Sequence, residues 1–207
     1  MVSRHEIEAK FSVPDLEKIR RCMLNLGGKV SIPKHLEHNR YFDTPDRDLK
    51  AGKEILRIRS GSQIHMTYKR QAGTFESRTE IELVLDSADN AQALLQALGY
   101  ELILKYAKER ETCELHGAQV MLDELPYGRF VEIEGPSLDN VRDVSGSLGL
   151  DWQKRVSMGY LALFERALEL LNLPPEEVSF TKLSKDHPIR SVDLGLVDAS
   201  AAEETVS

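Results

Sequence analysis

The stretch that decides the fold lies near the N-terminus, where residues 4–13 read Arg4-His5-Glu6-Ile7-Glu8-Ala9-Lys10-Phe11-Ser12-Val13. Successive side chains of a β-strand point to opposite faces, so this strand carries acid, acid and base on one face and apolar residues on the other. Carboxylates two positions apart on a strand lie about 6.6–6.8 Å apart and can share a divalent cation. For this strand alone, a solvated face with an ion pair is the simpler interpretation. The pattern becomes specific because it recurs downstream.

Seven further segments are predicted as strands, most of them with apolar residues alternating with charged ones. They cover residues 37–44, 54–60, 63–70, 77–85, 100–114, 120–125 and 130–135, with 100–114 either one long strand or a bent pair. The acids on the charged faces are Glu6, Glu8, Glu80, Glu82, Asp123, Glu132 and Glu134. The bases on these faces are Lys10, Arg57, Arg59, Lys69, Arg78, Lys108 and Arg110.

Helices with single apolar stripes are predicted at residues 14–26, 88–98, 138–148 and 160–171. They need a surface to cover, and the apolar strand faces supply it, which predicts an α+β protein. The charged faces would meet solvent in an open sheet, or the interior of a closed eight-stranded antiparallel β-barrel with flanking helices. Because these faces are almost all charged, rather than mixed with Ser, Thr, Asn and Gln, the closed barrel is favoured.

Charges inside a barrel are costly unless they pair or bind ions. A polyanion such as a phosphate chain would satisfy the bases, with arginine suited to bidentate contact. Mg²⁺ or Mn²⁺ would satisfy the acids, because both ions prefer oxygen ligands. The pattern therefore indicates a small-molecule phosphate site that depends on a divalent metal.

Composition excludes several classes of protein. The 207 residues are 41% hydrophobic and 29% charged, which is typical of a soluble globular protein. A net charge of −7 argues against a nucleic-acid binder. The two cysteines show no metal or redox spacing, no apolar run is long enough to span a membrane, and there is little room for a signal peptide. We therefore expect a cytoplasmic protein without membrane or nucleic-acid partners. We expect it to be a monomer or a homodimer.

The ordered set of charged motifs resembles the CYTH family, also called triphosphate tunnel metalloenzymes, which includes thiamine triphosphatases, inorganic triphosphatases and class IV adenylate cyclases. The motifs are Glu-x-Glu-x-Lys, Arg-x-Arg, the lysine of Thr-Tyr-Lys, Arg-x-Glu-x-Glu, Lys-x-Arg, Leu-Asp and a closing Glu-x-Glu. The matching residues are Glu6, Glu8, Lys10, Arg57, Arg59, Lys69, Arg78, Glu80, Glu82, Lys108, Arg110, Asp123, Glu132 and Glu134. The similarity covers about residues 4–173, so we expect a tunnel domain at 1–173 and a C-terminal extension at 174–207.

The resemblance implies roles for these residues. It implies metal ligands at Glu6, Glu8, Asp123, Glu132 and Glu134. It implies catalytic roles for Glu6, Glu8, Lys10, Glu80 and Glu82. It implies a phosphate cradle of Lys10, Arg57, Arg59, Lys69, Arg78, Lys108 and Arg110.

Three functions follow from this interpretation. The leading one is a metal-dependent triphosphatase acting on tripolyphosphate, thiamine triphosphate or a nucleoside triphosphate, because water as nucleophile needs no adenine pocket. The first alternative is a class IV adenylate cyclase that converts ATP to cyclic AMP and pyrophosphate. The second is a non-catalytic polyphosphate or nucleotide sensor, against which the complete set of acids argues. Residues 198–207 are expected to be disordered, and residues 199–207 dispensable.

Overall fold

The computed structural model describes residues 4–71, 77–173 and 189–200, with the backbone alone for residues 4–6, 71 and 77–79. The strands in this part of the chain are β1 (Arg4–Val13), β2 (Lys29–Asp43), β3 (Glu54–Ser60), β4 (Ile64–Gln71), β5 (Ser77–Leu85), β6 (Glu101–Leu115), β7 (Ala118–Leu125) and β8 (Gly128–Gly135). The helices are α1 (Leu16–Asn25), α2 (Asp48–Ala51), α3 (Ala88–Ala97), α4 (Leu138–Ser147) and α5 (Tyr160–Leu171), with 3₁₀ turns η1 (Trp152–Lys154) and η3 (Ser191–Leu194). Among these described residues, no helix is both long and apolar enough to cross a membrane.

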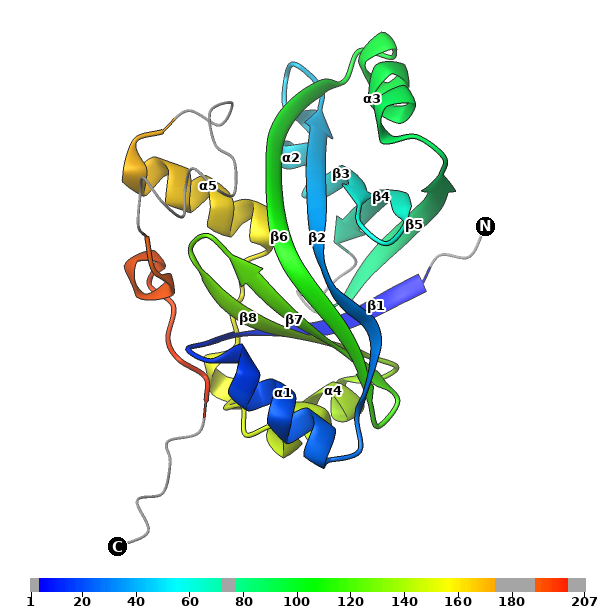
Figure 1. Ribbon diagram of the computed structural model, residues 1–207. Helices are drawn as coiled ribbons and strands as arrows, with labels where there is room; N and C mark the ends of the chain where they lie inside the picture. The colour runs from blue at the N-terminus through cyan, green and yellow to red at the C-terminus, as the bar shows by residue number, and fades with distance from the viewer. Residues whose placement is uncertain (1–3, 72–76, 174–188, 201–207) are drawn as a thin grey trace, which may run out of the picture.

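The strands form one antiparallel sheet in the order β1-β5-β4-β3-β2-β6-β7-β8 (Figure 1). The sheet closes on itself because β1 pairs with β5 on one side and with β8 on the other. The predicted antiparallel strands and flanking helices are therefore present. Residues 101–115 form one strand, which resolves the choice that the sequence leaves open for this segment.

Two elements differ from the prediction. Strand β2 begins at Lys29, well before the predicted residue 37, and its register with β6 shifts between Val30 and Ile32 and again between Ile32 and His35. These irregularities, next to Pro33, break the two-residue alternation on which the prediction depends. The four-residue helix α2 was not predicted, because it is too short to show an apolar stripe.

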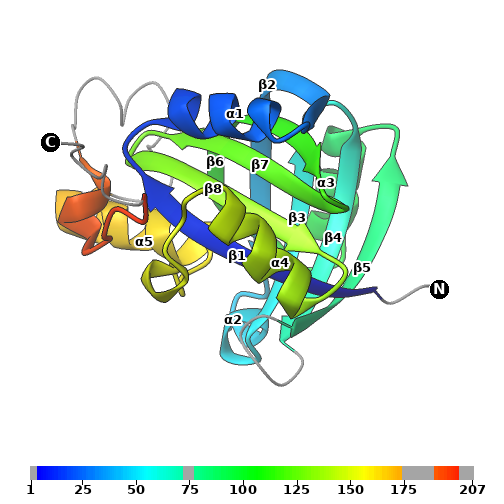
Figure 2. The same cartoon turned by 90° about the horizontal axis from the view of Figure 1, so that it is seen from below.

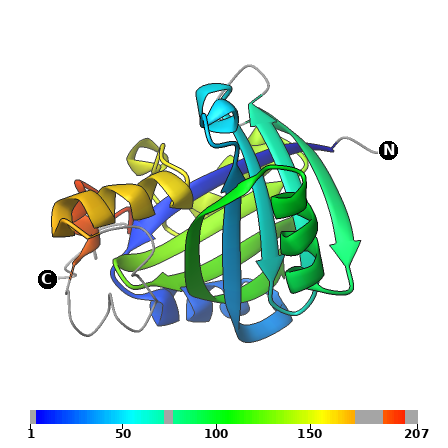
Figure 3. The same cartoon turned by 90° about the horizontal axis from the view of Figure 1, so that it is seen from above.

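Helices α1, α3 and α4 cover the apolar outer face of the barrel. Helices α1 and α4 lie beside β1, β7 and β8 (Figure 2), where Phe11, Val131 and Ile133 are fully buried. Helix α3 packs on β3, β4 and β6, and α5 lies on the side of the barrel away from α3 (Figure 3). Because one strand face is buried by helices, the alternate face must point into the barrel.

The chain after α4 returns to β1. Strand β8 pairs with residues 7–13 of β1, and the edge of β1 that faces away from β8 receives Val156, whose N–H donates to the carbonyl of Lys10 at 2.8 Å. Further along this edge the N–H of Ala199 donates to the carbonyl of Ser12 at 2.9 Å.

The prediction that residues 198–200 are disordered is therefore wrong. Ala199 is fully buried, and bridges join Ser12 to Asp198 and Leu150 to Ser200. The expectation failed because a segment of small and polar residues without apolar periodicity can still dock by its backbone. Residues 201–207 of the predicted tail lie outside the described residues.

Candidate active site

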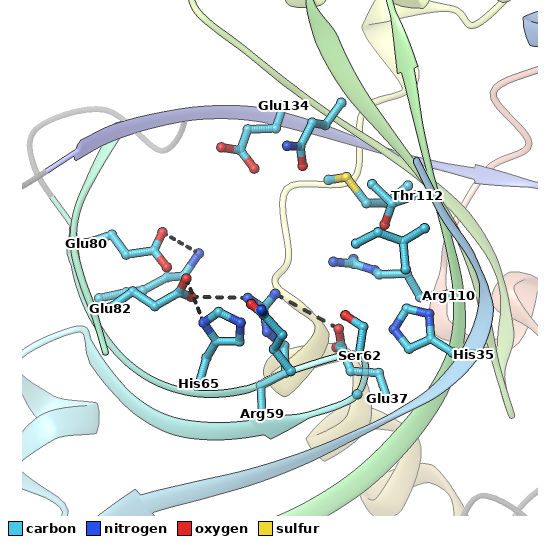
Figure 4. Close-up of a pocket in the computed structure, with 16 residues that line it drawn as sticks. His35, Glu37, Arg59, Ser62, His65, Glu80, Glu82, Arg110, Thr112 and Glu134 are labelled. Atoms are coloured by element: carbon cyan, nitrogen blue, oxygen red, sulfur yellow. Dashed lines mark hydrogen bonds and ion pairs between the residues drawn. The ribbon is translucent and has the colours of Figure 1, made fainter. Parts of the chain in front are cut away.

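The inner faces of the strands enclose two adjoining cavities of about 460 and 340 Å³. Both are lined by Arg59, Lys69, Arg110, Met121 and Glu134, so they are parts of one tunnel through the barrel. Figure 4 shows the larger cavity, into which side chains of several strands point. Of the two cavities, the smaller one has more apolar lining residues, among them Ile55, Leu56, Ile103 and Leu161.

Asp123 of β7 is completely buried and holds two bases of β6 together. Its oxygens accept from Lys108 Nζ at 3.1 Å and from Nε and Nη2 of Arg110 at 2.6 Å each. Tyr160 Oη donates to Asp123 Oδ2 at 2.6 Å. Four donors use most of the acceptor capacity of one carboxylate, so Asp123 in this arrangement neutralises and orients bases.

Glu132 of β8 joins the same cluster. Arg110 Nη2 donates to one of its oxygens at 2.6 Å, and Lys10 Nζ lies 3.3 Å from the other. Burial raises the pKa of Glu132, but Lys10, Arg110 and Lys108 outweigh burial and hold that pKa well below its ordinary value. For Arg110 the directions are reversed: burial lowers its pKa, but the nearby carboxylates of Asp123 and Glu37 raise it, and the net effect is a pKa well above the ordinary value. Glu132 and Arg110 therefore each favour their charged form.

A second cluster of charges lies on β3, β4 and β5. Arg59 Nη2 donates to Glu82 Oε2 at 3.1 Å (Figure 4). Thr67 Oγ1 donates to the same atom at 3.2 Å. His65 Nδ1 lies 3.0 Å from the other oxygen of Glu82, without the alignment of a hydrogen bond. Burial and the neighbouring arginines lower the pKa of Arg59.

Lys69 and Glu80 extend this second cluster. Their ion pair, with Nζ and Oε2 3.1 Å apart, lies beside the cluster on β4 and β5. The predicted inner faces of β3, β4 and β5 therefore do face the tunnel.

Glu37 of β2 joins the two clusters and was missed by the sequence analysis. The residue is 3% exposed, and its carboxylate lies 3.5 Å from Lys108 Nζ and 4.0 Å from Arg59 Nη1. It also accepts from Asn39 Nδ2 at 3.1 Å. Burial raises the pKa of Glu37, yet Lys108, Arg110 and Arg59 together lower it overall. Glu37 shares a strand face with Asn39 and Tyr41, and this alternation could have identified it as an inner residue. The irregular start of β2 hid the alternation of polar and apolar residues.

Tyr160 was also missed, because its sequence context fits the apolar stripe of a covering helix. It is 6% exposed and lies at the first position of α5. Its hydroxyl reaches Asp123, and the ammonium of Lys10 lies 3.8 Å from the centre of its ring. A helix periodicity cannot distinguish a tyrosine that packs outside the barrel from one that enters it.

The remaining predicted residues divide into three groups. Glu8 and Glu134 pair in register on β1 and β8 and line the smaller cavity. Arg57 lines the same cavity, and its Nε is buried without a hydrogen-bond partner among the described residues. The side chains of Glu6 and Arg78 lie outside the described residues.

The acids present fit a hard divalent cation. Within the described part of the chain, no three Asp, Glu, His or Cys side chains are close enough together to hold a metal. Glu8 and Glu134 are nevertheless adjacent in register on the cavity wall, with Glu6 two positions before Glu8 on the same strand. Carboxylate oxygens are the ligands that Mg²⁺ and Mn²⁺ prefer.

Comparison with known proteins gives consistent matches. The model of the CYTH domain matches residues 4–141. The adenylate cyclase CyaB of Aeromonas hydrophila is 27% identical over 181 residues, which are 81% of this chain and 92% of that protein.

Two solved structures are similar in fold. A Vibrio parahaemolyticus protein has a TM-score of 0.72 at 19% identity, covering 79% of this chain and 99% of that one. A Hippeastrum protein for which a dominant triphosphatase activity is described has a TM-score of 0.59 at 18% identity, covering 77% of this chain and 95% of that one.

Proposed function

The chain belongs to the CYTH family, and we propose that it is a divalent-metal-dependent hydrolase that binds a triphosphate inside its barrel and cleaves it. The observation that carries the proposal is the lining of the tunnel, where bases of β1, β3, β4 and β6 surround one continuous cavity. Phosphoryl transfer depends mainly on positioning and on neutralising charge, which such a lining supplies. The family is generally dependent on divalent metals.

The bases would bind the phosphate oxygens. Those proposed for this role are Lys10, Arg57, Arg59, Lys69, Arg78, Lys108 and Arg110. Arg57 supports this, because a buried guanidinium nitrogen without a partner among the described residues leaves a donor available to an anion. Asp123, Glu132 and Glu37 orient Lys108 and Arg110 before substrate arrives.

Glu6, Glu8 and Glu134 are the proposed metal ligands. Bound there, Mg²⁺ or Mn²⁺ would neutralise phosphate charge and lower the pKa of a bound water. Glu132 and Asp123, which the resemblance also implies as ligands, would have to exchange their contacts with bases to take part. Glu80 and Glu82 would orient the attacking water at the other side of the tunnel.

Adenylate cyclase activity is the second candidate. The relative named CyaB favours it, and so does the apolar lining of the smaller cavity, which could receive the organic part of a nucleotide. In that reaction the ribose 3′-oxygen attacks in place of water and pyrophosphate leaves. A third candidate, a sensor that binds without turnover, gives the proposed metal ligands Glu6, Glu8 and Glu134 no role.

One experiment separates these functions. The protein is incubated with tripolyphosphate, thiamine triphosphate or ATP, with Mg²⁺, with Mn²⁺ or with excess chelator, and the products are separated by chromatography. Metal-dependent release of phosphate supports the hydrolase, cyclic AMP supports the cyclase, and binding without any product supports the sensor. Full turnover in chelator after removal of metal would overturn the metal dependence.

A further inference from the structure

We propose that Tyr160 is a positioning residue of the tunnel, which holds Lys10, Lys108 and Asp123 in the arrangement that binds phosphate. The proposal rests on the proposed function and adds a component to it. Tyr160 lies beyond residues 4–141, which the family model matches. The consequence is that the segment after α4 completes the binding site as well as packing against the barrel.

The phenol contacts charges on three sides. Its hydroxyl donates to Asp123 Oδ2 at 2.6 Å. Lys10 Nζ lies 3.8 Å and Lys108 Nζ 4.4 Å from the centre of its ring, both within the range of cation–π attraction. Two ammonium groups that would repel each other are therefore held at one aromatic ring.

The hydroxyl acts as a donor in this position. Its oxygen lies 2.6 Å from Asp123 Oδ2, which also accepts from Lys108 and from Arg110. The phenol O–H therefore points at Asp123. By filling one acceptor position, Tyr160 limits how strongly Asp123 can draw Lys108 and Arg110 away from a phosphate.

The backbone places this ring in the tunnel wall. The N–H of Val156 donates to the carbonyl of Lys10 at 2.8 Å, which ties the segment before α5 to strand β1 of the barrel wall. After Tyr160, the fully buried Leu163 and Phe164 anchor the helix in the aromatic core, and the ring of Phe164 stacks on Tyr106 at 5.4 Å. The first turn of α5 thus lines the smaller cavity with Gly159, Tyr160 and Leu161.

A tyrosine that only packs would show a different contact pattern. Tyr127 provides the comparison: it is fully buried in the same aromatic cluster, and its hydroxyl meets the backbone carbonyl of Tyr160 at 3.4 Å. Neither cavity lining includes Tyr127. Tyr127→Phe is therefore a matched control for Tyr160→Phe, since each change removes one buried hydroxyl.

The test measures the binding of tripolyphosphate by calorimetry in the presence of chelator. It also measures the melting temperature, and the KM for tripolyphosphate with metal present. Tyr160→Phe keeps the ring and should weaken binding about three- to tenfold, because the donor to Asp123 is lost. Tyr160→Leu also removes the ring and should weaken binding by roughly a further factor of ten. Tyr127→Phe should leave affinity and KM unchanged.

Two results together support the proposal. Affinity for tripolyphosphate should fall from the wild type to Tyr160→Phe and again to Tyr160→Leu, and Tyr160→Phe should melt no lower than Tyr127→Phe. Affinity and KM of Tyr160→Phe equal to those of Tyr127→Phe would overturn it and leave Tyr160 as a packing residue. If Tyr160→Leu does not fold, Tyr160→Phe alone decides. A wild-type protein that neither binds nor cleaves tripolyphosphate, thiamine triphosphate or ATP would instead overturn the proposed function, and the inference with it.

Discussion

Replacing Asp123 by asparagine should destabilise the empty protein strongly. The carboxylate is 0% exposed and is the shared partner of Lys108 and Arg110. Breaking a buried ion pair by removing one partner typically costs about 3–5 kcal/mol. For a chain of this size that corresponds to a drop in Tm of roughly 6–20 °C. Asp46→Asn, at an exposed turn position, is the matched control and should melt like the wild type.

Tripolyphosphate should restore part of the lost stability, because a polyanion supplies the negative charge that Asp123→Asn removes. Thermal melts with and without the anion, in chelator, measure this: the rise in Tm should be larger for the variant than for the wild type. The reasoning is refuted if the Asp123→Asn variant melts like the wild type and no longer binds Mn²⁺. Asp123 would then be a metal ligand, as the resemblance implies.

The remaining predictions concern other parts of the tunnel. Glu8→Gln should abolish turnover without lowering Tm, because Glu8 faces Glu134 in register and its neutralisation relieves repulsion. The outward-facing, fully buried Ile133 should show the opposite when changed to Ala, with a loss of about 2–5 kcal/mol in melts and intact chemistry. Arg59→Ala should weaken tripolyphosphate binding about ten- to a hundredfold in calorimetry, with only partial recovery in Arg59→Lys; unchanged affinity would remove this strand from the site. Because the pKa of Glu37 is lowered in the folded protein, its contribution to stability is complete above its ordinary pKa of 4.5 and is lost as the pH falls below that value. Glu37→Gln should therefore show a smaller difference in Tm between pH 7 and pH 3 than the wild type, and an equal difference would contradict this.

Much of the tunnel could be predicted from alternation alone. The two-residue period of a strand is a local property, so the parity of Glu8 and Lys10 on β1, or of Lys108 and Arg110 on β6, sets which side chains share a face. The helices then decide which face is outer, because their apolar stripes must be buried. These two local patterns are enough to separate the inner from the outer residues on every strand whose alternation is regular.

The partners of these residues could not be predicted in the same way. Asp123 and Arg110 meet because β6 and β7 pair in one particular register, and Lys10 meets Glu132 because β8 pairs with β1, although the two strands lie far apart in the sequence. The sequence offered Asp123 only as an acid on an inner face. The register surrounds it with bases, a contact that favours orienting Lys108 and Arg110 over binding a metal.

Two inner residues depended on the tertiary structure altogether. Glu37 follows the register shifts at the start of β2, which hide the alternation of the strand as a whole. Tyr160 comes from a helix whose period indicates only burial. On the strands whose alternation is regular, the amino-acid sequence by itself determined which side chains point inward, because that depends on the periodicity of each segment. Closure of the barrel and docking of the C-terminal segment decided which of them meet, because contacts between distant segments depend on how the whole chain packs.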